Sequence, residues 1–270
     1  MSATPTERAS THLGADVKTV TELSGGGLSE VCKLTLSSGQ TVVVKHAHLA
    51  AEEACMLRMI GATGCPAPEV IFSEADLMVM SHLPAGAAPD PAAWAQAGGA
   101  VAQLHAARGN MFGWGQDHAF GALPIHNEAM DAWPAFWAER RLLDASSTLP
   151  ASLAKRLEAL ARDVTNRLPM HPPPALLHGD LWAGNLLFGP EGFSGLIDPA
   201  CNYGDPEVDL AMLTLFARPD AAFFGAYGAL DQGWEARRPI YQLWPALVHL
   251  RLFGDGYRPL VNGLLEACGV

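Results

Sequence analysis

Hydrophobic and polar residues alternate in short segments over the first part of the chain, and Gly- and Ser-rich turns separate these segments. This pattern predicts five strands, at 17–23, 31–36, 41–45, 69–72 and 77–80. Between the third and fourth strand, the segment 50–60 is rich in strong helix formers and predicts a helix. The predicted order of elements is therefore β-β-β-α-β-β.

A stretch rich in Pro, Gly and Ala follows, and beyond it the pattern changes from strand-like to helical. Helices are predicted at 92–108, 128–144 and 152–168 and again between 206 and 268, with brief strands at 175–177, 186–188 and 195–197. The chain thus predicts an α+β fold with two lobes, a small antiparallel-sheet lobe and a larger helical lobe. We place these lobes at 1–82 and 92–270, with 83–91 as the hinge between them.

Composition and net charge exclude several classes of protein. Of the 270 residues, 49% are apolar and 17% are charged, which excludes a largely disordered chain. The formal net charge of −11 argues against a nucleic-acid partner, because such a protein would repel a phosphate backbone. The chain has no run of 18 apolar residues and no secretory signal at its start, so we expect a protein without a membrane partner. Five cysteines without a Cys-x-x-Cys pair favour the reducing cytoplasm.

Three polar residues near the predicted short strands indicate phosphoryl transfer. Asp180 and Asn185 are separated as in the protein-kinase catalytic loop, and Asp198 follows the next apolar strand. One carboxylate can orient a substrate hydroxyl, while an amide oxygen and a second carboxylate can hold Mg²⁺ against nucleotide phosphates. Gly179 stands where the kinase motif has Arg. The alternative is a hairpin in which Asp180 and Asn185 only cap turns.

The N-terminal segment carries signals for a nucleotide lobe. Gly25, Gly26 and Gly27 lie between two predicted strands, where backbone amides can approach phosphates closely. Lys45 ends the third strand and Glu53 lies on the following helix, an arrangement that suits a phosphate-positioning pair. Alternatively Lys45 is a protective charge on an edge strand, and Glu53 lies on a solvated helix face. Glu52 competes with Glu53 for the role.

Further acidic residues follow Asp198, and two interpretations remain open for them. Asp205, Glu207 and Asp209 could form a two-metal cluster with Asp198. The favoured interpretation is that Asp205 or Glu207 caps the helix that Pro206 opens, and that Asp209 braces the catalytic loop.

These motifs together resemble the fructosamine kinase (ketosamine-3-kinase) family, which belongs to the aminoglycoside- and choline-kinase-like folds. The resemblance rests on 178–185 (HGDLWAGN), 197–200 (IDPA) and 204–212 (GDPEVDLAM). Shorter matches in the same order extend it over nearly the whole chain, at 104–105, 112–114, 127–128, 133, 136–142, 233–237 and 253–254.

The resemblance implies an ATP-dependent kinase that phosphorylates the 3-hydroxyl of a fructosamine- or ribulosamine-type ketosamine, free or protein-bound. The product then decomposes and frees the amine, so the activity reverses glycation. The family pattern implies that Asp180 is the catalytic base and that Asn185 and Asp198 bind Mg²⁺. It also implies that ATP contacts the glycine loop, the Lys45–Glu53 pair and a hinge formed by Ser81, His82 and Leu83. The alternative substrate on this fold is another small amino alcohol or an aminoglycoside.

Departures from the family pattern bear on substrate choice. In 247–251, Val248 and Arg251 replace two Asn residues of the family run, so the preferred sugar or amine can differ. Possible substrate-side residues are Trp182, Trp234, Tyr241 and His249, each with core packing as its alternative. The intact set of catalytic residues argues against an inactive nucleotide-binding module. A metal-dependent phosphatase would need clustered His and Asp ligands instead.

Overall fold

The N-terminal lobe is built on a five-stranded antiparallel sheet with the strand order β1-β2-β3-β5-β4. The computed structural model describes residues 3–23, 29–144 and 146–270. The strands are β1 (Val17–Glu22), β2 (Glu30–Leu36), β3 (Thr41–His46), β4 (Val70–Ser73) and β5 (Leu77–Ser81). With α2 (Ala50–Ala62) between β3 and β4, the predicted order β-β-β-α-β-β is confirmed.

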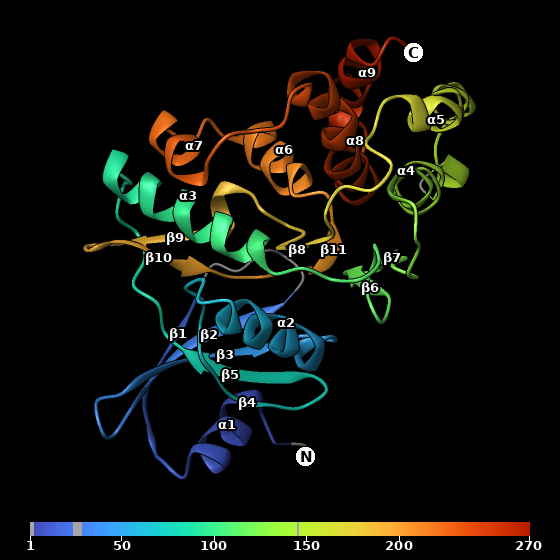
Figure 1. Ribbon diagram of the computed structural model, residues 1–270. Coiled ribbons are helices and arrows are strands. Elements are labelled where there is room, and N and C mark those ends of the chain that lie inside the picture. Colours follow the sequence, from blue (N-terminus) through green and yellow to red (C-terminus); the bar gives the residue numbers. More distant parts are fainter. Residues whose placement is uncertain (1–2, 24–28, 145) are drawn as a thin grey trace.

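Two helices cover opposite faces of this sheet (Figure 1). Val42 and Val44 of β3 pack with Ala9 of α1 (Pro5–Leu13), whereas Val43 between them packs with Ala54 of α2. This division follows from the alternation of side chains along a strand. Helix α1 was not predicted, although the sequence carries its signal in Thr4, Pro5 and Glu7. Thr4 and Glu7 form a reciprocal capping box, with Pro5 in the first turn.

Helix α2 also belongs to the core of the second lobe. Its residues Met56 and Ile60 are buried in the large cluster formed by the helical lobe, together with Cys65 just beyond the helix. The backbone N–H of Cys201, from the helical lobe, lies 3.2 Å from the Met56 sulfur. Helix α2 is therefore packed between the sheet on one side and the helical lobe on the other.

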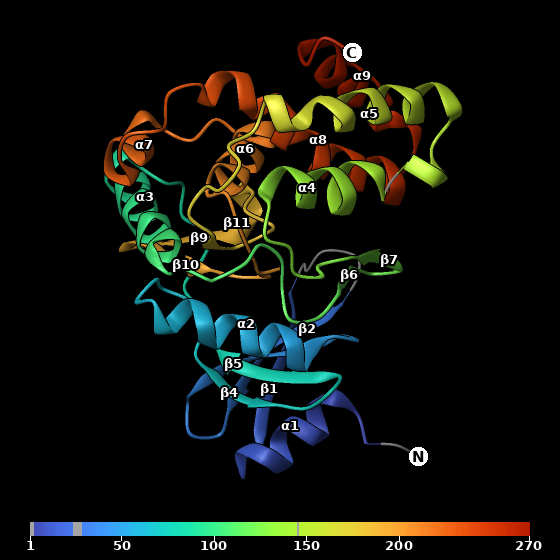
Figure 2. The ribbon, with the colours of Figure 1, turned by 45° about the vertical axis from the view of Figure 1, so that its right-hand side comes forward.

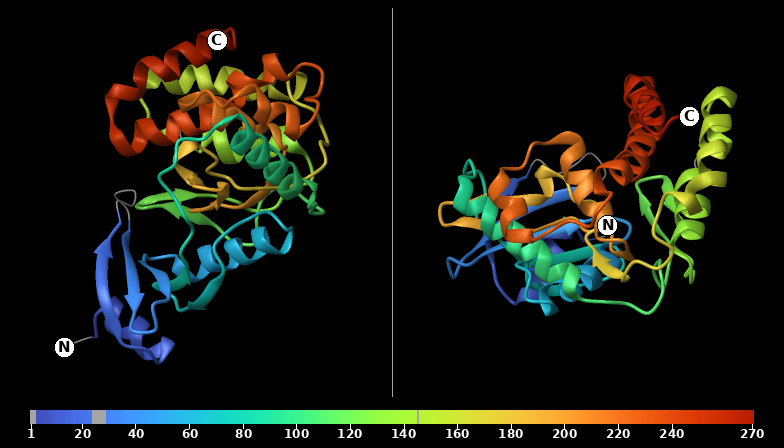
Figure 3. Two further views of the ribbon diagram at one scale, coloured as in Figure 1. Left: turned by 90° about the vertical axis from the view of Figure 1, so that its left-hand side faces the viewer. Right: turned by 45° about the horizontal axis from the view of Figure 1, so that its top comes forward.

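The helical lobe begins after an extended segment and lies above the sheet lobe in Figures 1 and 2. Its helices are α3 (Pro91–Ala106), α4 (Trp133–Trp137), α5 (Ala151–Asp163), α6 (Glu207–Phe216), α7 (Ala221–Tyr227), α8 (Trp234–Phe253) and α9 (Arg258–Ala267). The two views of Figure 3 show the helical lobe from other sides, with the chain ends on different lobes. Among the described residues, no helix combines the length and apolar character needed to span a membrane.

The helix predicted at 128–144 is shorter than expected. It begins at Trp133, because Pro134 lacks a backbone N–H and fits only the first turn of a helix. After Trp137 the helix widens into a π-helical segment, Ala138–Leu143. Its aromatic residues pack in the lobe core, where the Trp133 indole N–H donates to the Tyr241 hydroxyl at 2.9 Å.

Short strand pairs hold the loops at the junction of the lobes. They are β6 (His118–Phe120) with β7 (Leu123–Ile125), β8 (Ala175–Leu177) with β11 (Asn202–Gly204), and β9 (Leu186–Gly189) with β10 (Gly192–Leu196). The predicted strands correspond to β8, β9 and β10, whereas β6, β7 and β11 were not predicted. Figures 1 and 2 place the β6–β7 hairpin at the level between the two lobes.

Helices α3 and α7 approach so closely that one glycine is required between them. A Cβ on Gly98 would lie 2.1 Å from the backbone oxygen of Phe223, whereas a Cβ on the neighbouring Gly99 would meet nothing within 4 Å. We expect Gly98→Ala to lower the free energy of unfolding by about 1–3 kcal/mol, because the helices must move apart. The matched control Gly99→Ala should raise it by about 0.5–1 kcal/mol, since alanine favours an exposed helix interior. Urea unfolding of both variants checks the contrast, and equal effects of the two substitutions would contradict it.

Candidate active site

The loop between β8 and β9 is held in place by one buried carboxylate. Asp209 of α6 is 1% exposed and accepts hydrogen bonds from the backbone N–H of His178 at 2.7 Å and of Gly179 at 3.0 Å. The Nε2–H of His105 donates to the same carboxylate at 3.0 Å. Burial disfavours the charge of Asp209, but the hydrogen bonds from His105 and His178 hold its pKa below the ordinary value. Asp209 therefore occupies the bracing position that the sequence predicted.

The turn that follows requires glycine. Gly179 has a φ of 80°, and a Cβ at this position would lie 1.9 Å from the backbone oxygen of Ala200. The Arg of the protein-kinase motif is therefore sterically excluded here. The preceding His178 is fully buried, and its Nε2–H donates to the Ile197 carbonyl at 2.9 Å. This bond ties the loop to the segment that carries Asp198.

Asn185 positions the carboxylate of Asp180. Its side-chain amide nitrogen donates to the Asp180 backbone oxygen at 2.8 Å and to Asp180 Oδ2 at 3.0 Å. Among the described residues, none donates a hydrogen bond to Asn185 Oδ1, which leaves this oxygen available. Burial raises the pKa of Asp180 to about 7, the nearby charge of Asp198 adds to the rise, and the hydrogen bond from Asn185 opposes it. A carboxylate with a near-neutral pKa suits proton transfer at physiological pH.

Lys45 contacts two carboxylates, one from each lobe. Its Nζ lies 2.7 Å from Glu53 Oε2 on α2 and 2.8 Å from Asp198 Oδ1, and its side chain is 7% exposed. Burial disfavours the charged ammonium, yet Glu53 and Asp198 outweigh this effect and raise the pKa of Lys45. Strand β3 lies between β2 and β5, so Lys45 is not an edge-strand charge. Glu53, rather than Glu52, faces it.

Asp198 has an uncommon backbone conformation. It is the one non-glycine residue with positive φ among the described residues, at 54°, two residues after the end of β10. Asp tolerates this left-handed region better than most residues, at a cost that surrounding structure must offset. The conformation accompanies the contact of Asp198 with Lys45, 153 positions away in the chain.

The predicted nucleotide hinge lies at the end of β5. The Ser81 N–H donates to the Glu69 carbonyl, and the Ser81 hydroxyl accepts from the Glu69 N–H, both at 2.9 Å. His82 and Leu83 follow outside regular secondary structure and form no backbone–backbone hydrogen bond within the described part of the chain. Their peptide groups are thus available for a ligand. Gly25, Gly26 and Gly27 lie outside the described residues.

A cavity of about 160 Å³ opens beside Asp180 and is walled mainly by apolar side chains. Two of the predicted substrate-side residues line it, Trp182, which is 42% exposed, and His249. Trp234 and Tyr241 do not line this cavity and are buried, in keeping with the core role that was their alternative. Sequence reasoning missed Phe120 and Trp244 as wall residues, together with Met212, Pro245, Leu252 and Phe253.

His249 presents a hydrogen-bond acceptor in an aromatic setting. Its Nδ1–H donates to the Pro245 carbonyl at 2.8 Å, and its ring contacts Phe216 and Tyr257 at centroid distances of 4.5 and 5.1 Å. Burial lowers the pKa of His249, which favours the neutral imidazole. Because Nδ1 carries the proton, Nε2 is left as an acceptor.

Comparison with known proteins supports the resemblance over the whole chain. A protein-family model described as fructosamine kinase matches residues 1–269. The chain belongs to the fructosamine kinase family. A probable ketoamine kinase from Lactiplantibacillus plantarum is 33% identical over 273 residues, which cover 93% of this chain and 94% of that protein. The match to a probable ketoamine kinase from Synechocystis is 37% identical and covers 65% of this chain and 62% of that protein.

Solved structures agree with this family assignment. A crystal structure described as that of a candidate fructosamine-3-kinase from Thermobifida fusca YX-ER1 superposes with a TM-score of 0.89 at 31% identity, covering 97% of this chain and 96% of that one. An aminoglycoside phosphotransferase in a ternary complex with AMP-PNP and hygromycin B gives a TM-score of 0.61, with coverage of 94% and 90%. At 19% identity the latter shows the fold alone. The predicted family, the bilobal α+β kinase fold and the ATP-dependent kinase class are therefore confirmed.

Proposed function

We propose that this member of the family transfers the γ-phosphoryl group of ATP to the 3-hydroxyl of a fructosamine- or ribulosamine-type ketosamine. The observation that carries the proposal is the contact of Lys45 with both Glu53 and Asp198, next to the Asp180–Asn185 pair. These residues come from both lobes, and Asp180 among them lines a cavity large enough for part of a small substrate. Phosphoryl transfer needs this kind of positioning more than it needs covalent chemistry from the protein.

Each side chain has a distinct task in this proposal. The ammonium of Lys45, kept charged by two carboxylates, binds nucleotide phosphate oxygens, and Glu53 fixes its direction. The free peptide groups of His82 and Leu83 bind the adenine edge. Asp180 accepts a hydrogen bond from the substrate hydroxyl and receives its proton as the new bond to phosphorus forms. Asn185 keeps the Asp180 carboxylate turned toward the cavity.

The residues present also fit a magnesium ion. Asn185 Oδ1 and Asp198 Oδ2 are oxygen donors that accept no hydrogen bond from the described residues. Mg²⁺ usually takes one or two protein oxygens and completes its shell with water and phosphate oxygens. Over the described ranges, no group of three or more His, Cys, Asp or Glu side chains is placed to hold a metal, which disfavours the two-metal alternative. When bound, Mg²⁺ would offset the negative charge of the β- and γ-phosphate oxygens.

The cavity favours a ketosamine over the polycationic alternative. Asp180 is the one acidic side chain among the described residues that line it, and the rest of the wall is largely apolar and aromatic. An aminoglycoside carries several ammonium groups, which would lack carboxylate partners here. His249 Nε2 can accept a hydrogen bond from a sugar hydroxyl, and Trp182 offers a flat surface to the sugar ring.

A substrate panel tests the proposed function directly. ATP consumption is measured with ketosamines derived from ribose, erythrose and fructose, and with aminoglycosides and choline as controls. We expect ketosamine-dependent consumption of ATP and a product phosphorylated on the 3-hydroxyl, as identified by NMR. Turnover of choline or an aminoglycoside without turnover of any ketosamine would refute the proposal.

A further inference from the structure

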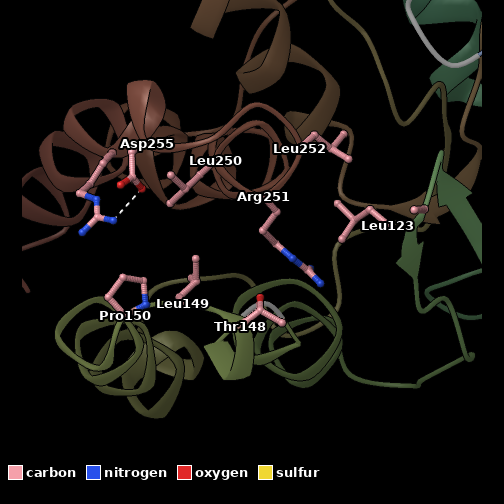
Figure 4. A pocket seen from close by; sticks show the side chains of 10 residues that line it. Leu123, Thr148, Leu149, Pro150, Leu250, Arg251, Leu252 and Asp255 are labelled. Carbon is pink, nitrogen blue, oxygen red and sulfur yellow. Dashed lines mark hydrogen bonds and ion pairs between the residues drawn. The ribbon is translucent and has the colours of Figure 1, made fainter.

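A second and larger pocket lies next to the substrate cavity, with a volume of about 400 Å³. It is formed between the end of α8, the start of α5 and strand β7, and Figure 4 shows its walls. Leu149, Pro150 and Leu250 give it apolar sides, whereas Arg251 reaches from α8 toward the opposite wall that carries Thr148 (Figure 4). Its size is within the range of small-molecule sites in proteins.

Arg251 is unusual because its side chain is largely buried and yet forms no hydrogen bond with the described residues. Its side chain is 13% exposed, and its Nη1 is fully buried without an acceptor among the described residues. The nearest carboxylate, Asp144, lies 3.7 Å away, and its Oδ2 also lacks a hydrogen bond within the described part of the chain. Nη1 and Asp144 Oδ2 thus face each other as a long ion pair, and the described residues supply no hydrogen-bond acceptor to the other two guanidinium nitrogens, Nε and Nη2.

The other arginine of the pocket provides a contrast. Arg258 Nη2 donates to Asp255 Oδ1 at 2.6 Å, and its side chain is 39% exposed. The carboxylate of Asp144 is shared between Arg251 and His126, because its Oδ1 lies 3.6 Å from His126 Nε2. Asp144 therefore balances the charge of Arg251 but accepts no hydrogen bond from the N–H groups of its guanidinium fork. A ligand carboxylate would match that fork with two parallel hydrogen bonds.

The pocket and the substrate cavity are lined by the same two elements. Leu252 lines both spaces, so α8 forms a shared wall between Arg251 and the cavity beside Asp180. The β6–β7 hairpin does the same, with Phe120 in the substrate cavity and Leu123 in the second pocket. A molecule that presents a sugar hydroxyl to Asp180 would extend past Leu252 toward Arg251.

On the basis of the proposed function, we infer that the second pocket binds the amine-derived part of the ketosamine and that Arg251 binds a carboxylate on it. The preferred substrates are then ketosamines of α-amino acids, with an apolar side chain against the leucines of the pocket. Arg251 is a specificity-determining residue in this scheme and takes no part in phosphoryl transfer. An independent effector with a carboxylate would use the same chemistry, and the experiment must separate the two.

The experiment compares two ketosamines made with the same sugar, one of leucine and one of leucinamide. These differ in the carboxylate alone, and calorimetry without nucleotide measures their binding to the full chain. We expect the leucine compound to bind about tenfold more tightly, as for hydrogen bonds to a charged group. Arg251→Gln should remove this preference. Arg251→Lys, which keeps the charge opposite Asp144 but not the fork, should reduce it, and the matched control Arg258→Gln should retain it.

The outcomes separate this inference from the proposed function. Equal binding of the two compounds, no binding of either, or a preference that persists in Arg251→Gln would overturn the inference.

N-acetylleucine, which has no sugar, tests whether the pocket binds an independent effector. If it binds through Arg251 without competing with the ketosamine, the site belongs to an effector and the inference is wrong. An Arg251-dependent preference without phosphorylation of either compound would support the carboxylate site and refute the kinase reaction. Thermal unfolding and ATP affinity of each variant confirm that it is folded.

Discussion

Replacing Asp180 with asparagine is expected to lower the rate of phosphoryl transfer by about 10²- to 10⁴-fold and to leave ATP affinity nearly unchanged. Asparagine keeps the size of the side chain and can still meet Asn185, but it cannot accept the substrate proton. Asp180 makes no contact with Lys45 comparable to that of Asp198, so the nucleotide side of the site is preserved. Single-turnover rates beside calorimetric ATP affinities measure the two effects separately.

Asp198→Asn is the matched comparison for this prediction. It removes a charge that contacts Lys45 at 2.8 Å, and asparagine tolerates the left-handed backbone at this position. We expect it to weaken binding of magnesium–ATP as well as to slow transfer. If Asp180→Asn lost ATP affinity to the same degree as Asp198→Asn, the assignment of Asp180 to proton transfer and of Asp198 to magnesium–ATP binding would be wrong. Near-normal turnover of Asp180→Asn would make Asp180 a structural turn residue.

The second large effect concerns the carboxylate beneath the catalytic loop. The backbone N–H groups of His178 and Gly179 now donate to Asp209. Asp209→Asn places an amide N–H₂ against one of them, and it leaves His105 without its anionic partner. We expect a loss of about 3 kcal/mol in the free energy of unfolding, together with slower transfer, because the loop loses a backbone anchor and His105 loses its charged partner. Unfolding in urea and steady-state turnover measure the two consequences.

A surface carboxylate provides the control for Asp209. Asp163 pairs with Arg167 at 2.7 Å on the exposed face of α5, so Asp163→Asn should leave stability and turnover close to those of the wild type. An Asp209→Asn variant as stable and active as Asp163→Asn would show that the buried network does not hold the loop.

The sequence predicted the order of the lobes because strand and helix periodicities are local signals that do not depend on the partner element. It failed for the three-residue strands β6, β7 and β11, which are not wholly apolar, whereas the equally short β8 is an apolar run and was predicted. The predicted helix start at 128 was also wrong, because Pro134 fits only the first turn of a helix and the helix begins at Trp133. Helix α1 was not predicted, although its capping box can be recognised in the sequence.

In the candidate site too, contacts within one loop could be predicted from the sequence, whereas contacts between distant segments could not. Asp180 and Asn185 lie in one loop, so their spacing alone indicated that they meet. The contact between Lys45 and Asp198 spans the two lobes and was not predicted, because the family pattern implied only that Lys45 binds ATP and that Asp198 binds Mg²⁺. The cavity wall was missed at Phe120 and Trp244, because an aromatic residue in a sequence gives the same signal whether it faces a core or a ligand.

The packing of α2 on both of its faces affects how this kinase can be controlled. Ala54 and Leu57 are buried against the sheet while Met56 and Ile60 are buried in the helical lobe, so withdrawing the helix would expose apolar surface on both sides. Glu53 is carried on this helix, and its ion pair with Lys45 is therefore established when the chain folds. Activation by a swing of this helix, a switch that protein kinases use, would be costly here. Sugar adducts arise by spontaneous chemistry rather than by a cellular signal, and an enzyme that is always assembled can act on them whenever they form.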